Sequence, residues 1–150
     1  MKLGHNAFSR LTASLICALV LTFSAGAVAQ SETFSARLSP MPTTPQTVTT
    51  ITGEGEVILT LDGNTLTVSG NFTGMNSVAT MAHVHNGPPA QPGQVVHQLE
   101  VTKMPAGEIS AVLELTDAQV TALRNNELYI QVHSETNPPG ELRGWIFARN

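Results

Sequence analysis

The sequence predicts an all-β domain: an antiparallel β-sandwich or flattened Greek-key barrel of about seven or eight strands, with one short helix. Three observations favour this class. Apolar and polar residues alternate in short segments, 12 glycines and 9 prolines supply turns, and only 12% of the residues are charged while 41% are hydrophobic. A coiled coil or a disordered polyelectrolyte would carry far more charge, so both classes are excluded.

The N-terminal segment has the pattern of a cleaved export signal. Two basic residues flank the start of an apolar run from Leu11 to Ala25, and Ala27-Val28-Ala29 fits the small-x-small rule for signal peptidase. We expect cleavage after Ala29 and an exported mature protein, either periplasmic or secreted. A membrane anchor in the mature form is not expected, because the apolar run is shorter than the roughly 20 residues of a spanning helix.

The mature chain is expected to form one domain. Residues 30–46 are an extended N-terminal segment that carries a first strand at Thr33–Leu38, and residues 47–150 form the β-sandwich, with the domain beginning near residue 33. Three prolines between residues 40 and 45 favour an extended course over the surface at the end of the first segment.

The remaining strands are predicted from period-two alternation. Residues 57–61 and 65–72 both alternate, and Asp62-Gly63-Asn64 between them indicates a hairpin turn. Further strands are expected at Ala79–His85, Gln94–Val101, Glu108–Leu115, Leu128–His133 and Glu141–Ala148.

One helix is expected at Asp117–Arg124. Thr116 followed by Gln119 matches a capping box, and Val120 and Leu123 lie three residues apart on one apolar side. The helix therefore has two turns or so.

The composition narrows the chemistry that the mature chain can carry. The single cysteine, Cys17, lies inside the signal, so disulfides, thiolate metal sites and cysteine nucleophiles are excluded from the mature form. Removal of the signal takes two of the seven basic residues and no acidic one, and Lys103 becomes the only lysine. Dispersed arginines argue against nucleic-acid binding, so the partner is expected to be an unidentified extracytoplasmic ligand or protein.

Three histidines are expected on the outer face of the sheet. His83 and His85 lie two residues apart on one strand and so project to the same side, while the alternating apolar residues project to the core. In the two later strands the residues expected to point outward are Tyr129, Gln131, His133, Glu141, Arg143 and Trp145.

This spacing suits a metal site formed by His83, His85 and His133. Neutral histidine is the usual nitrogen ligand for both copper and zinc, and we expect copper before zinc. The residues expected around the three ligands are Tyr129, Gln131, Glu141 and Arg143. In the alternative interpretation, the histidines only hydrogen-bond two proline loops to the sheet, and Glu141 and Arg143 form an ion pair.

His97 is a separate case. It alternates with Val95, Leu99 and Val101, so its side chain is expected to face the apolar layer or its margin. A satisfied core histidine is the favoured interpretation, with a role as a fourth ligand at the rim left open.

Five motifs occur in a fixed order along the chain. They are Ala82-His83-Val84-His85, Gly107 before an alternating strand, Leu115-Thr116 at the start of the helix, Leu128-Tyr129-Ile130-Gln131-Val132-His133, and Gly140-Glu141-Leu142-Arg143-Gly144. This order resembles the CHRD domain, the module named after chordin, over most of Phe34–Phe147. The resemblance implies an extracytoplasmic all-β domain, and we predict a non-enzymatic binding or structural module. The growth-factor ligand of chordin is not carried over, because this chain lacks the cysteine-rich modules of that protein.

A weaker resemblance is to copper–zinc superoxide dismutase, an antiparallel sandwich that holds copper on the outside of its barrel. His83, His85 and His133 match its copper ligands in order, and Arg143 falls where a substrate-guiding arginine would. The zinc-loop ligands and the disulfide of that family have no counterpart here. A dismutase-like copper redox protein is therefore the alternative function.

Overall fold

The computed structural model describes residues 30–149, so the expected export signal lies outside the described residues. This part of the chain is all-β with one short helix. Its elements are β1 (Glu32–Pro40), β2 (Glu54–Asp62), β3 (Thr65–Thr73), β4 (Ala79–Asn86), β5 (Gln94–Val101), β6 (Gly107–Glu114), α1 (Asp117–Arg124), β7 (Leu128–Ser134), β8 (Leu142–Trp145) and β9 (Phe147–Ala148).

Eight of the strands form a closed antiparallel barrel. The order is β2-β3-β6-β5-β4-β7-β8-β1, and β1 pairs with β2 to close the ring, while β9 adds to β1. The prediction of a sandwich or flattened barrel is thus resolved in favour of the barrel, and an open sandwich is wrong. Strand β3 lies beside β6 rather than beside β4, which gives β3 to β6 the Greek-key order.

The first hairpin shows why these residues form strands. Strands β2 and β3 pair from Glu54↔Thr73 to Asp62↔Thr65, and the turn between them needs a left-handed residue, which Gly63 supplies at φ +59°. Alternate residues of both strands are buried, so one face of the hairpin contributes to the core.

The core is made of aliphatic and aromatic side chains from the inner face of every strand in the ring. The largest fully buried residues of this core are Phe34, Leu38, Leu59, Leu61, Leu66, Phe72, Leu99, Ile109, Leu123, Leu128 and Ile130. The helix begins at the expected residue, and both halves of the Thr116–Gln119 capping box are formed.

Strand β5 and the last predicted strand depart from simple alternation. A bulge in the β4–β5 pairing places Val84 opposite His97 but His85 opposite Val95, so Val96 is an extra residue in β5. Val95 therefore turns outward and is 52% exposed, which corrects the expectation that it shares a face with His97. The strand expected over Glu141–Ala148 is divided into β8 and β9 at the buried Ile146.

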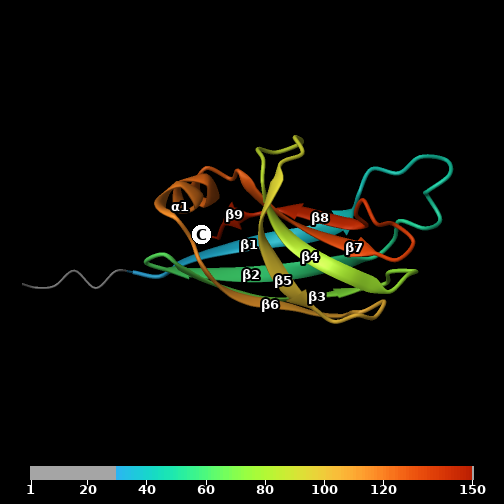
Figure 1. Cartoon of the computed structure of the whole chain (residues 1–150), viewed down its shortest axis with the longest axis horizontal. Helices are drawn as coiled ribbons and strands as arrows, with labels where there is room; N and C mark the ends of the chain where they lie inside the picture. The colour runs from blue at the N-terminus through green and yellow to red at the C-terminus, as the bar shows by residue number, and fades with distance from the viewer. Residues whose placement is uncertain (1–29, 150) are drawn as a thin grey trace, which may run out of the picture.

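The loops lie at defined places on the elongated barrel. Figure 1 shows α1 near one end of the long axis and the loop between β1 and β2 near the other, with the loop between β4 and β5 projecting between them. The β1–β2 loop is extended only at its start, because residues 45–50 fold into turns. Within residues 30–149, no helix has the length and apolarity needed to cross a membrane.

Candidate metal centre

The outer faces of β4, β7 and β8 form a ladder of polar and aromatic residues. On β4 and β7 the cross-strand pairs are Met81↔His133, His83↔Gln131 and His85↔Tyr129. On β7 and β8 they are Gln131↔Arg143 and Tyr129↔Trp145. The alternation of both strands thus places the expected residues on one surface, with Ala82, Val84, Ile130 and Val132 in the core beneath.

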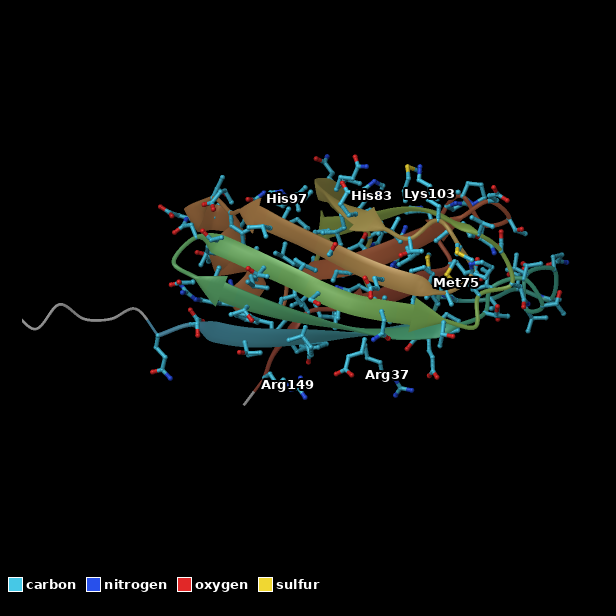
Figure 2. All side chains as sticks on the ribbon, turned by 90° about the horizontal axis from the view of Figure 1, so that it is seen from below. Arg37, Met75, His83, His97, Lys103 and Arg149 are labelled. Carbon is cyan, nitrogen blue, oxygen red and sulfur yellow. The ribbon has the colours of Figure 1, made fainter. Side chains whose placement is uncertain are left out.

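Three histidine rings converge on this surface. One ring nitrogen from each of His83, His85 and His133 lies within 4.8 Å of the other two. His83 Nδ1 is 3.2 Å from His133 Nε2, and the ring centroids of His83 and His85 are 5.9 Å apart. Figure 2 places His83 on the same side of the barrel as His97, opposite Arg37 and Arg149. The three histidines therefore lie close together on the face that the sequence predicted for them, in an arrangement compatible with a metal site.

His85 is fixed by the loop between β4 and β5. Its Nδ1 lies 3.1 Å from the carbonyl oxygen of Gly93, and its ring stacks on Tyr129 with centroids 4.7 Å apart and an interplanar angle of 11°. Because a carbonyl only accepts, Nδ1 carries the proton and Nε2 is left with its lone pair. That Nε2 is buried and has no hydrogen-bond partner.

His133 is fixed in the same way by the loop after β7. Its Nδ1 lies 2.8 Å from the carbonyl oxygen of Pro138, which again leaves Nε2 unprotonated. That nitrogen faces His83 Nδ1 and is 3.5 Å from Gln131 Nε2. Both histidines therefore hold a loop with one nitrogen and present the other to the shared space.

The surroundings favour neutral imidazoles. Burial lowers the pKa of His83 below its ordinary value of 6.5, and the neighbouring His133 and His85 lower it further. Burial is also the main cause that lowers the pKa of His85; the charges of His133 and Arg143 act in the same direction, and the Gly93 carbonyl opposes them. Neutral rings carry the free lone pair that a metal ion needs.

The outer face of β7 is covered although it points away from the core. Tyr129, Gln131 and His133 are 1%, 4% and 8% exposed. The hydroxyl of Tyr129 accepts a 3.0 Å hydrogen bond from Gly93 N, and Gln131 Nε2 donates to the Pro139 carbonyl at 2.8 Å. The expected outward direction is thus correct, but two loops lie over these side chains.

Arg143 is bound to Gln131. Its Nε and Nη2 both donate to Gln131 Oε1, at 2.9 and 2.7 Å. The guanidinium carbon also lies 4.9 Å from the centroid of Tyr129 and 5.7 Å from that of Trp145, within cation–π range. A cation is thereby held beside the histidine group.

Glu141 does not take the place expected for it. The side chain is fully buried, Oε1 accepts from Thr52 N at 3.2 Å, and Oε2 accepts from Asn137 Nδ2 at 3.1 Å. The expected outward direction and the ion pair with Arg143 are both wrong. The reason is local: Glu141 precedes β8 at the end of a turn, where strand alternation does not apply, and it ties that turn to the segment after β1.

His97 does not join the group. Its Nε2 lies 3.2 Å from Gln119 Oε1 of α1. His97 is thus a hydrogen-bonded histidine at the margin of the core, as the strand alternation predicts. The bulge in β5 and the register of the barrel keep it on the inner side, opposite the buried Val84. A role as fourth ligand is therefore excluded for His97 in this arrangement.

Comparison with protein families agrees with this architecture. The family model described as CHRD domain matches residues 34–146, the bulk of the chain. The chain belongs to the CHRD domain family. The matched span of this CHRD domain contains all three histidines and both loops that orient them. No curated protein and no solved structure gave a match in the corresponding searches.

Several groups that build the site were not predicted. The carbonyl oxygens of Gly93 and Pro138 orient two of the rings, but backbone atoms leave no direct signal in a sequence. Gly140 is a further example: at φ +137° it approaches Gln131 so closely that an added Cβ would lie 2.7 Å from Gln131 Nε2. The glycine before Glu141 in the GELRG motif could have pointed to such a close approach.

Proposed function

We propose that this CHRD domain is an exported, non-enzymatic binding module that holds one copper ion through His83 Nδ1, His85 Nε2 and His133 Nε2. The observation that carries the proposal is the buried, unpartnered Nε2 of His85. A buried polar atom without a partner costs about 1 to 3 kcal/mol, so native structures avoid it unless the atom has a use. A metal ion supplies the missing partner.

The orientation of the rings supports the same proposal. Histidine ligands of metals almost always donate their second ring N–H to a carbonyl or carboxylate, which fixes the tautomer. His85 and His133 have this contact through Gly93 and Pro138. The interpretation that these histidines only attach the proline loops therefore leaves the buried Nε2 of His85 without a partner.

The three ring nitrogens can bind one ion once the widest separation between them shortens slightly. Two nitrogens bound at about 2.0 to 2.1 Å can be at most about 4.2 Å apart. His83 and His133 already satisfy this limit at 3.2 Å, whereas the full group spans 4.8 Å. His85 has the more distant ring, so the widest separation has to close by at least about 0.6 Å. His83 is the least buried of the three rings, so we expect it to be the one that turns toward His85.

The choice of copper over zinc follows from affinity order and ligand type. Sites made of nitrogen ligands bind Cu²⁺ more tightly than Zn²⁺, and imidazole suits both. Zinc is the second choice. Export would place the domain where it meets such ions outside the cytoplasm, and the export signal proposed for residues 1–29 is part of this account.

A titration tests the proposal directly. Mature domain without a histidine tag is titrated with copper and with zinc, and the same measurement is made on His83→Ala and His133→Ala. We expect one ion per chain for the wild type, and for each variant a loss of affinity at least as large as the roughly 10- to 100-fold loss that removal of a group supporting a ligand causes. His97→Ala, which removes a histidine outside the group, is the control and should bind as the wild type does. Equal binding by all four proteins would overturn the proposal.

Arg143 is the reason to test a second function, a dismutase-like copper redox protein. Its positive charge lies close enough to His85 to lower the pKa of that ring, and a cation beside a metal attracts an anionic substrate. Superoxide turnover by the copper-loaded wild type, reduced in Arg143→Gln, would favour this alternative. Tight copper binding without turnover would favour the binding module.

A further inference from the structure

Met81 is the outward residue of β4 next to the histidine group. It lies directly opposite His133 in the β4–β7 pairing and two residues before His83 on the same strand. Directly opposed residues have Cβ atoms about 4.5 to 5.5 Å apart, and residues i and i+2 share a face. Two of the three proposed ligands are therefore the nearest outer-face neighbours of Met81.

The Met81 side chain is 44% exposed, although the inward-facing Ala82 that follows it is fully buried. Methionine has three rotatable bonds and a polarisable thioether, so its sulfur can move over a neighbouring residue at low energy. This side chain does not pack in the barrel core, so it can contact residues of the outer face.

We propose that Met81 Sδ is a fourth ligand that makes this centre selective for Cu(I). The inference rests on the proposed function, because it adds one ligand to the same three histidines. Thioether sulfur is a soft ligand that favours Cu(I), whereas imidazole is a suitable ligand for both copper and zinc. Three imidazoles and one thioether complete a four-coordinate shell supplied wholly by the protein.

A complete shell also explains why the module binds rather than catalyses. Catalytic metal sites keep one position open for water or substrate, whereas closed sites hold the ion. With Met81 in place, the ion is covered on the side where His83 is half-exposed. The centre then binds reduced copper, and access to the metal requires movement of the flexible Met81 side chain.

The test compares Cu(I) and zinc affinities of the wild type, Met81→Leu and Met104→Leu, measured anaerobically against a competing chelator. Leucine conserves size and apolarity, so folding is preserved. Met104 is the matched control, because its side chain is 58% exposed and its own carbonyl oxygen accepts a hydrogen bond from Ala79 N at the start of β4. We expect Met81→Leu to weaken Cu(I) binding by about tenfold or more, with zinc binding changed less than about twofold.

The outcomes separate the two proposals. If Met81→Leu and the wild type bind Cu(I) equally, the thioether ligand is refuted and the three-histidine site stands. If the wild type binds neither ion, both proposals fail. A parallel loss in Met104→Leu would show a general effect of exposed methionines and would also overturn the assignment to Met81.

A second measurement reports on the sulfur itself. In protein labelled with ¹³C at the methionine methyl groups, Cu(I) should shift the resonance that is missing from Met81→Leu and leave that of Met104 in place. An unmoved Met81 resonance at saturation with Cu(I) would exclude sulfur ligation, whatever the affinities show.

Discussion

At the scale of single residues, the site depends on histidines that use their two ring nitrogens differently. The sequence predicted which face His83, His85 and His133 occupy, because strand alternation alone decides it. It could not predict the tautomers, because these follow from the carbonyls of Gly93 and Pro138. Loop attachment and metal binding are alternatives on the sequence alone, whereas the geometry makes them compatible.

The lowered pKa values of His83 and His85 predict a pH dependence of stability for the metal-free domain. The unfolded chain takes up protons at an ordinary pKa of 6.5, above that of the folded rings, so stability is fully present above that pH and falls as the pH drops below it. Chemical denaturation with a chelator present should show this fall. In the double variant His83→Gln, His85→Gln the fall below pH 6.5 should be smaller, and an unchanged profile would contradict the assignment.

Gly140→Ala should displace Gln131, which contacts both His133 and Arg143 at the site. The added Cβ would lie 2.5 Å from Met41 Sδ and 2.7 Å from Gln131 Nε2, and φ is +137°. We expect a loss of unfolding free energy of about 2 to 3 kcal/mol, from backbone strain together with the displaced Gln131. Gly63→Ala is the control, because its φ is +59° and nothing lies within 4 Å of the added Cβ. Equal losses for the two variants would show that the contact with Gln131 has no energetic weight.

At the scale of elements, the strands and the helix could be predicted wherever a local pattern decides them. The β2–β3 hairpin and the capped helix follow from alternation, turn residues and the capping box. The bulge in β5 could not be predicted, because Val95 and Val96 are equally apolar and only the pairing with β4 decides which one turns outward. The direction of Glu141 could not be predicted for a related reason: its burial depends on contacts with Thr52 and Asn137, which lie in other segments or turns.

We predict that loss of the N-terminal cap of α1 lowers stability and leaves the metal centre intact. Thr116→Ala removes the side chain that accepts from Gln119 N, and loss of such a cap costs about 0.5 to 2 kcal/mol. Thr116→Ser keeps the oxygen and should retain most of the stability. Urea unfolding measures both. Because the helix contacts His97 and not the three-histidine group, copper affinity should be the same in both variants.

At the scale of the whole molecule, the strand order of the barrel places β7 between β4 and β8, although β8 is far from β4 in the chain. The sequence could not choose between a sandwich and a closed barrel, because the pairing of β1 with both β2 and β8 is a long-range contact with no local signature. The registers of β4 with β7 and of β7 with β8 align Arg143, Gln131 and His83 in one row across three strands. The site is thus a property of the barrel and not of any one motif.

The most direct test of a three-histidine metal centre is a long-range ¹H–¹⁵N spectrum of the imidazoles, recorded before and after one equivalent of Cu(I). In the metal-free domain His85 and His133 should both carry the proton on Nδ1. Cu(I) should then shift His83 Nδ1, His85 Nε2 and His133 Nε2 and leave both nitrogens of His97 unchanged. Spectra in which these three nitrogens do not respond to Cu(I) would contradict the account.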